Sequence, residues 1–159
     1  MKRRDLLRCL SGTWLLSLPA IAVFAQDEGK RYPVEKTDAE WRRILTPEQY
    51  YVTRQKGTER AFAGKYLNNK EKGLYRCVCC GADLFHSDAK FDSGTGWPSF
   101  SRPVSSRNVE EIKDTSYGMN RTELVCSRCG AHLGHLYTDA PGKLRYSVNS
   151  AALQFEKGR

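Results

Sequence analysis

Four cysteines occur in two copies of one short motif, which is the strongest chemical signal in this 159-residue chain. The two copies are Cys77-x-x-Cys80-Gly81 and Cys126-x-x-Cys129-Gly130. Two residues between thiolates let a tight turn direct both sulfurs at one ion, and the following glycine relieves backbone crowding. Two such turns complete a tetrahedron with no open position, as structural zinc requires. The motifs therefore predict one structural Zn²⁺ ion.

Disulfide bonds are the alternative for these cysteines, because the chain begins like an exported protein and could meet an oxidising environment. Paired Cys-x-x-Cys-Gly motifs are more typical of metal sites, so zinc is favoured. Cys79 lies inside the first motif and is interpreted as a spectator thiol. Zinc would hold its four ligands as thiolates, which makes redox chemistry at them unexpected.

Three further stretches are rich in glycine or polar side chains, which a hydrophobic core does not readily accommodate. Residues 91–100 form a glycine-rich loop that displays Trp97 between aromatic residues, and residues 132–135 read His-Leu-Gly-His. In the third stretch, a predicted strand, Ser147 and Asn149 alternate and so share one face. Taken singly, each stretch has a structural explanation: a core indole, histidines near the metal, or polar side chains that face water.

Together these stretches closely resemble the methionine-R-sulfoxide reductase B (MsrB, SelR) family. The matching motifs lie at residues 91–100, 128–135 and 144–151, beside both cysteine motifs and the segment 55–60. The resemblance implies a mainly β fold of two antiparallel sheets, with a short N-terminal helical segment and a structural zinc. It also implies reduction of methionine R-sulfoxide in proteins or peptides or as the free amino acid, which repairs an oxidative lesion.

The resemblance assigns roles to individual residues. Trp97 would form the apolar wall against the S-methyl group, and Phe100 would also contact the substrate. His135 and Asn149 would orient and polarise the sulfoxide oxygen, with His132 alongside. A thiolate would attack the sulfoxide sulfur while the oxygen is protonated, which leaves methionine and a sulfenic acid.

Ser147 stands where the family has a catalytic cysteine or selenocysteine. A cysteine thiol, with an ordinary pKa of about 8.5, can be tuned to a thiolate, whereas a serine hydroxyl stays protonated. The chain as written is therefore expected to bind the sulfoxide without reducing it. An inactivating cysteine-to-serine replacement is favoured, because the rest of the site is intact. The alternative is a natural pseudoenzyme that binds oxidised methionine or a protein partner.

Thr95 is a second departure, because many family members have a recycling cysteine at this position. A cysteine form of the chain would then be regenerated by an external thiol, and a thioredoxin-like protein is the expected donor. A serine hydrolase that uses Ser147 with His132 or His135 is a weaker hypothesis. It lacks a Gly-x-Ser-x-Gly motif and a clear orienting acid.

The elements that position these residues begin with two helices. A capping-box pattern at residues 37–40 opens a short helix with an apolar side of Trp41, Ile44 and Leu45. A second pattern at residues 46–49, with proline in its first turn, opens another helix, and Gly57 is a natural stop.

Beyond Gly57 the sequence changes to short β-rich runs, separated by glycine, proline, serine and asparagine, which predict an antiparallel β domain. The predicted strands cover residues 74–77, 109–113, 122–126, 133–137, 144–148 and 153–155.

The first 25 residues have the layout of a cleavable export signal: a basic start, an apolar run over residues 10–24, and small or modest residues before a polar stretch. The run of about 15 residues is shorter than the about 20 that span a bilayer, so a permanent anchor is not expected. A twin-arginine signal is favoured over an ordinary secretory one. Residues 26–36 would be a linker and 37–159 the domain, located in a periplasm or secreted.

The formal charge of +8 invites comparison with proteins that bind nucleic acid. Four basic residues and one acid lie within the first ten positions, and without them 22 basic and 17 acidic residues leave +5. The remaining charges are scattered, with no aromatic-interleaved basic stretch, so nucleic-acid binding is not expected.

Overall fold

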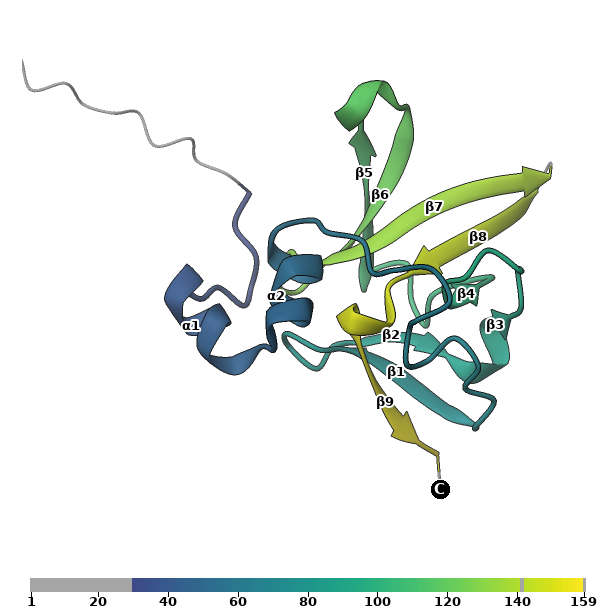
Figure 1. Ribbon diagram of the computed structural model, residues 1–159, viewed down its shortest axis with the longest axis horizontal. Coiled ribbons are helices and arrows are strands. Elements are labelled where there is room, and N and C mark those ends of the chain that lie inside the picture. The colour runs from purple at the N-terminus through teal and green to yellow at the C-terminus, as the bar shows by residue number, and fades with distance from the viewer. Residues whose placement is uncertain (1–29, 141, 159) are drawn as a thin grey trace, which may run out of the picture.

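The computed structural model describes residues 30–140 and 142–158, and the predicted signal at 1–25 lies outside this part. Figure 1 shows the arrangement of the described elements. The helices are α1 (Asp38–Ile44) and α2 (Pro47–Arg54). The strands are β1 (Gly73–Cys77), β2 (Asp83–His86), β3 (Lys90–Phe91), β4 (Ser99–Phe100), β5 (Val109–Asp114), β6 (Arg121–Cys126), β7 (His132–Ala140), β8 (Lys143–Val148) and β9 (Leu153–Lys157).

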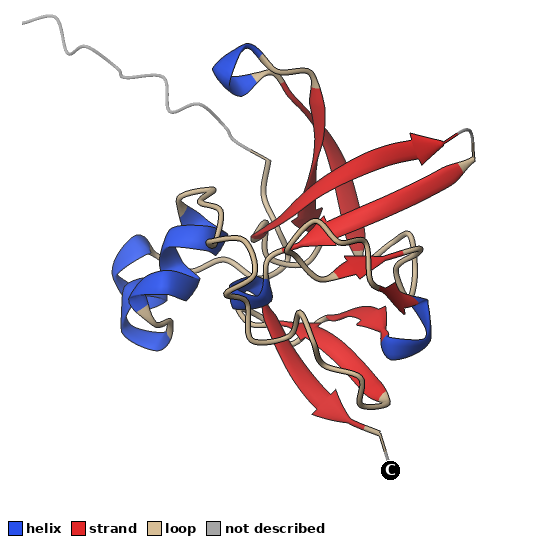
Figure 2. Cartoon of the chain, turned by 45° about the vertical axis from the view of Figure 1, so that its right-hand side comes forward, coloured by secondary structure: helices blue, strands red, loops and turns tan. Residues whose placement is uncertain are grey.

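The strands form two antiparallel sheets, as the resemblance implied. The smaller sheet has the order β2-β1-β9, and the larger has the order β3-β4-β8-β7-β6-β5. The two α-helices lie together beside the strands (Figure 2), and α2 packs on β7 and on a 3-10 turn at Ser150–Ala152. The prediction of a mainly β domain with a short N-terminal helical segment is therefore confirmed.

Both predicted capping boxes are present. The Glu40 amide donates to Thr37 Oγ1 at 3.3 Å, and the Glu40 carboxylate accepts from the Thr37 amide at 2.8 Å. Thr46 and Gln49 make the same reciprocal pair at the start of α2. One detail differs from prediction: Ile44 is 53% exposed, because the short α1 buries Trp41 and its cap Leu45 instead.

The core lies where aromatic side chains of the two sheets meet. Phe85 of β2 stacks on Phe100 of β4 with ring centroids 4.5 Å apart, and Tyr75 of β1 meets Phe100 edge-on at 5.2 Å. Phe100, predicted as a substrate contact, is 0% exposed. The prediction is corrected accordingly: Phe100 belongs to the core and presents no surface to a ligand.

The sequence did not predict β2, β3 and β4. The last two have only two residues each, and β4 is a strand because it pairs with β8. Residues 30–36, assigned to a linker, contact the domain: the Val34 amide donates to the Arg128 carbonyl at 2.8 Å. In the described part of the chain, no helix is long and apolar enough to cross a membrane.

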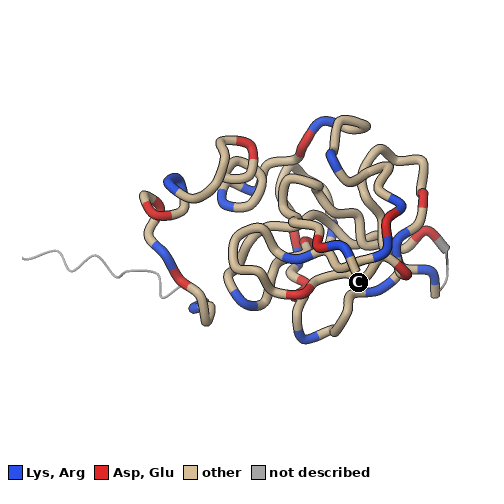
Figure 3. The backbone as a smooth tube through the Cα atoms, turned by 90° about the horizontal axis from the view of Figure 1, so that it is seen from below, with Lys and Arg blue, Asp and Glu red and all other residues tan. Residues whose placement is uncertain are grey.

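Charged side chains are distributed over the described chain with both signs interspersed. Figure 3 shows lysine and arginine segments and aspartate and glutamate segments scattered over the same parts of the backbone. Many of the charges are paired, for example Arg76 with Asp83 and Glu156, and Arg145 with Asp139.

We expect Phe100→Ala to lower the free energy of unfolding by about 3–5 kcal/mol, because the cavity would open between the two sheets. Denaturant unfolding measures this. Val104→Ala is the control, since Val104 is 48% exposed and its loss should cost less than about 0.5 kcal/mol. Parent-like stability of Phe100→Ala would contradict the assignment of this ring to the core.

Candidate functional site

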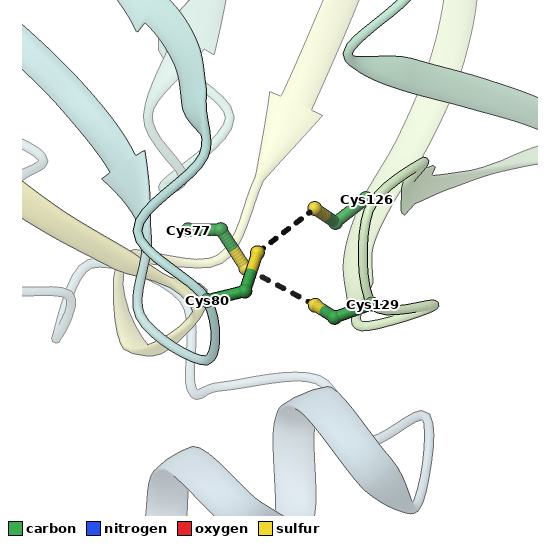
Figure 4. A group of neighbouring side chains, drawn as sticks. All are labelled: Cys77, Cys80, Cys126 and Cys129. Carbon is green, nitrogen blue, oxygen red and sulfur yellow. Dashed lines mark hydrogen bonds between the residues drawn. The ribbon is translucent and has the colours of Figure 1, made fainter. Parts of the chain in front are cut away.

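The four motif cysteines meet at the junction of the two sheets. Cys77 ends β1 of the smaller sheet and Cys126 ends β6 of the larger, so each sheet contributes one motif (Figure 4). The Sγ atoms of Cys77 and Cys129 lie 3.6 Å apart, as do those of Cys80 and Cys126. All four ligand atoms lie within 4.8 Å of one another.

This cluster has the dimensions of a metal site. A metal–thiolate bond of about 2.3 Å in a tetrahedron places sulfurs about 3.8 Å apart, close to the 3.6 Å observed. A disulfide would need about 2.05 Å, and all five cysteines in the described chain are free. The residues therefore fit a tetrahedrally held metal ion. Cys79 is only 9% exposed and packs in the core beside the cluster.

A pocket of about 180 Å³ lies on the larger sheet, and it brings together Trp97, His135, Ser147 and Asn149 of the predicted site, whereas His132 is not part of its lining. Ser147 lies at its centre in β8, directly opposite His135 of β7 on one side and Ser99 of β4 on the other. Cross-strand neighbours of this kind have their Cβ atoms about 4.5–5.5 Å apart. The lining residues are Thr58, Trp97, Arg121, Gly134, His135, Tyr137, Ser147, Val148 and Asn149.

An extra residue in β7 places the two histidines on the same side of the sheet. In a regular strand, residues three positions apart face opposite ways. Here Gly134 pairs with Leu124 and His132 pairs with Val125, so Leu133 is a bulge. The His132 and His135 rings consequently meet edge-on, with centroids 5.4 Å apart.

His135 is held by a carboxylate that the sequence did not point to. Its Nε2 lies 2.9 Å from Asp114 Oδ2, at the end of β5. The Asp114 carboxylate also accepts hydrogen bonds from the backbone amide and the hydroxyl of Ser116, and from Arg121 Nη2 at 2.6 Å. The Ser116 hydroxyl and amide, followed by His135 and Arg121, hold the pKa of Asp114 below its ordinary value. Burial lowers the pKa of His135 despite Asp114, so the ring is neutral at neutral pH.

His132 forms a second buried pair. Its Nδ1 lies 2.7 Å from Glu123 Oε1, and Lys56 Nζ contacts the other carboxylate oxygen at 2.8 Å. Burial opposes ionisation of Glu123, but the hydrogen bonds of His132 and Lys56 outweigh it and lower the pKa of this carboxyl. His132 is 2% exposed, and its position favours support of the neighbouring His135 over direct contact with a ligand.

Asn149 borders the pocket, but its side chain is bonded to the backbone. Its Oδ1 accepts from the Glu59 amide at 3.0 Å, and its Nδ2 donates to the Leu133 carbonyl at 3.0 Å. It therefore ties the end of β8 to β7 and to the segment around Glu59. Any polarisation of a ligand would come from the second hydrogen of Nδ2.

Glu59 connects the separate parts of the pocket, although it is not itself part of the lining. Its carboxylate accepts the amides of Ser150 at 2.7 Å and Ala151 at 2.9 Å, and its carbonyl accepts Trp97 Nε1 at 3.1 Å. Burial raises the pKa of Glu59, and the two backbone donors oppose the shift. One residue thus holds both the indole wall and the turn after Asn149.

The glycine-rich loop closes the pocket from the side of β4. The Ser93 hydroxyl lies 2.8 Å from those of Thr95 and Ser99, so a chain of hydroxyls leads from Thr95 to the strand beside Ser147. Across the pocket, Gly134 approaches Ser147 closely, since a Cβ there would lie 2.0 Å from the Ser147 carbonyl oxygen. Only glycine permits this packing of β7 on β8.

Three residues of the site were missed from the sequence: Glu59, Asp114 and Arg121. Glu59 lies in the 55–60 segment that carried part of the resemblance, which was a signal without an assigned role. Asp114 and Arg121 flank the turn between two predicted strands, where charged residues are ordinary. Only the pairing of β5, β6 and β7 brings them to His135.

The fold and site define a class of protein: a two-sheet β domain with a four-cysteine metal cluster and a small pocket built around position 147. The SelR domain family matches residues 45–157. Peptide methionine sulfoxide reductase MsrB of Methanosarcina barkeri is 60% identical over 126 residues, which cover 77% of this chain and 88% of the relative.

Two further relatives carry the same printed name. The protein of Synechococcus sp. is 56% identical over 126 residues, covering 78% of this chain and 93% of its own. The protein of Acinetobacter baumannii is 58% identical over 125 residues, covering 77% and 90%. The chain belongs to the MsrB family.

We expect Glu59→Gln to weaken the pocket. An amide has one acceptor oxygen, so one of the two backbone N–H groups now bound by the carboxylate would lose its partner, at a cost of about 1–3 kcal/mol. Trp97 and the turn after Asn149 would move with it. Denaturant unfolding and calorimetric titration with an R-sulfoxide peptide measure the two effects.

Glu48→Gln is the matched control for this substitution, because Glu48 is an exposed carboxylate in the first turn of α2. It should leave peptide affinity unchanged. Equal peptide affinities for the Glu59→Gln and Glu48→Gln proteins would show that Glu59 does not position the pocket.

Proposed function

We propose that this chain is an MsrB-type domain that binds the R-sulfoxide of methionine in proteins or peptides, and that it does not reduce it. The observation that carries the proposal is the pocket: Ser147 lies opposite His135, with Trp97 and Asn149 around it. The indole supplies an apolar wall for the S-methyl group. Asp114 accepts the Nε2–H of His135 and so fixes the ring in the wall of the pocket with Nδ1 as an acceptor, while Arg121 supplies the positive charge beside the sulfoxide oxygen.

Reduction needs a sulfur nucleophile at position 147. A thiolate there would attack the sulfoxide sulfur and form an S–S bond while the oxygen is protonated to a hydroxyl group. The hydroxyl group would then pass to the cysteine sulfur as the S–S bond breaks, which releases methionine and leaves a sulfenic acid. Two external thiols would then release water and form a disulfide. Serine stays protonated and its oxygen cannot carry this oxidation, so binding is retained without turnover.

The other residues of the pocket are those expected of a reductase, which supports the loss of reduction alone. A cysteine form would depend on an external, thioredoxin-like thiol, because Thr95 supplies no recycling thiol and Cys79 is buried at the metal cluster. An inactivating cysteine-to-serine replacement explains this better than a natural pseudoenzyme, since the partners of His135 and Asn149 are all in place. The alternative is a natural pseudoenzyme that binds oxidised methionine or a protein partner without reducing it.

A serine hydrolase gains one argument from the structure, because Asp114 is an acid that orients His135. Within the described chain, however, one nitrogen of each of these two histidines bonds to a carboxylate, and neither ring bonds to Ser147 Oγ. A hydrolase needs that contact for proton removal. The sulfoxide-binding proposal therefore fits the geometry better.

The metal is proposed to be Zn²⁺, because four thiolates in a closed tetrahedron are the donor set that it takes in structural sites. It would supply folding free energy and no catalysis, since no coordination position is left open. Export to a periplasm or secretion is proposed from the pattern of residues 1–25 alone.

Ser147→Cys should convert the chain into a reductase of R-sulfoxide peptides when dithiothreitol is present, whereas the serine form should bind the same peptide without turnover. Peptide reduction followed by chromatography and binding by calorimetry measure the two properties. Ser99→Cys is the matched control, because it places a thiol on the neighbouring strand at a fully buried position and should stay inactive. An inactive Ser147→Cys protein would refute the proposal, and turnover by the serine form would refute the assigned nucleophile.

Metal analysis should find about one zinc per chain, equal in the parent and Ser147→Cys proteins. Cys126→Ser should lose the metal and much of the stability, because a ligand is removed from a buried cluster. Cys79→Ser should keep the metal, since the four-cysteine cluster does not include Cys79. Disulfides at the motif positions would overturn the assignment.

A further inference from the structure

A second and larger cavity adjoins the sulfoxide pocket. It has a volume of about 500 Å³ and lies between the end of α2, the segment 55–58 and the hairpin of β5 and β6. Thr58, Arg121 and His135 line both cavities, so the two form one continuous recess. A group held in the smaller pocket would have its neighbours in the larger one.

The charged groups of this cavity are paired with one another. Glu123 bonds to Lys56 and His132, and Asp114 bonds to Arg121 and His135. The negative charges of these two carboxylates are balanced by basic side chains in the same wall, so the cavity offers no strong net charge to a ligand. A free amino acid with its ammonium and carboxylate groups finds no dedicated partners there.

Two polar groups in this wall remain without hydrogen bonds within the described chain. They are His132 Nε2 and Arg121 Nε. Both atoms are buried in the wall, so the contacts available to a ligand come from the exposed groups around them.

Exposed aromatic and apolar side chains form the rim of the cavity. Tyr117, in the hairpin turn, is 92% exposed and has a φ of 55°. This left-handed conformation is costly for a bulky residue, and the ring gains no burial in return. Tyr51 of α2 is 50% exposed and Met119 of the hairpin 42%. All three line the cavity and present apolar surface at its mouth.

We propose that this second cavity receives the residues that flank the oxidised methionine in an extended, unfolded polypeptide, and that Tyr117 and Tyr51 contact an aromatic or apolar side chain next to it. The inference rests on the proposed function and extends it from one side chain to its neighbours. Ser147 is 8% exposed, so the sulfoxide side chain must reach inward while its main chain crosses the rim. A folded partner cannot supply such a strand without local unfolding.

The test uses the full chain, in which serine prevents turnover, and isothermal titration with three probes. These are free methionine R-sulfoxide and two blocked peptides with the R-sulfoxide between either glycines or phenylalanines. The phenylalanine peptide should bind about fivefold more tightly than the glycine peptide, the contribution expected of one aromatic contact. Tyr117→Ser should remove most of this difference and leave the affinity for the glycine peptide unchanged.

Val104→Ser is the matched control, because Val104 is exposed and lines neither cavity. It should preserve the preference for phenylalanine. Equal affinities for the two peptides, or a preference that survives Tyr117→Ser, would overturn the cavity proposal while the proposed function stands on glycine-peptide binding. No binding of any probe would overturn both. Thermal unfolding of Tyr117→Ser should match the parent, since the Tyr117 side chain is 92% exposed.

Discussion

The cluster of four thiolates is the constraint on which the rest of the domain depends. Each sheet contributes one cysteine motif, so a metal ion held there bonds the two sheets directly, with the aromatic stack around Phe100 behind it. Binding energy at such a site is folding energy. The second motif is also the connection between β6 and β7, and β7 begins at His132. The position of both histidines therefore depends on the four-cysteine cluster, and four thiolate ligands would leave a metal ion held there no open coordination position for a substrate.

The pocket is rigid because each of its side chains is held by a group from a different part of the chain. His135 is hydrogen-bonded to Asp114 of β5, Asn149 to the amide of Glu59, and Trp97 to the carbonyl of Glu59. The bulge at Leu133 then brings the two histidines to one side of the sheet. A bound sulfoxide would meet donors and an apolar wall that need little rearrangement, and such preorganisation is what gives a small pocket its affinity.

Sequence reasoning found what local patterns encode. Cysteine spacing fixed the metal ligands, capping boxes gave both helix starts, and alternation gave six of the strands, because each signal is complete within a few residues. The remainder depends on pairing over long distances. β4 exists through its contact with β8, Phe100 is buried because β2 stacks on it, and Glu59 bonds to amides some 90 positions away. No local pattern records such contacts, and a tryptophan-proline-serine-phenylalanine motif cannot reveal which of its two rings faces the ligand.

The serine at position 147 would, under the proposed function, separate the binding of a sulfoxide from its reduction. In the proposed function, affinity for a sulfoxide would come from the indole, the histidine and the hydrogen bonds that hold them, and none of these hydrogen bonds involves the Ser147 side chain. Turnover requires a polarizable, ionisable sulfur at one point of β8. Replacing sulfur by oxygen keeps the strand, its pairing with β4 and β7, and nearly the same volume, so the fold has no reason to change. Under the proposed function such a domain would be left with binding alone, and its selectivity for the sequence around the oxidised methionine would then decide which proteins it binds.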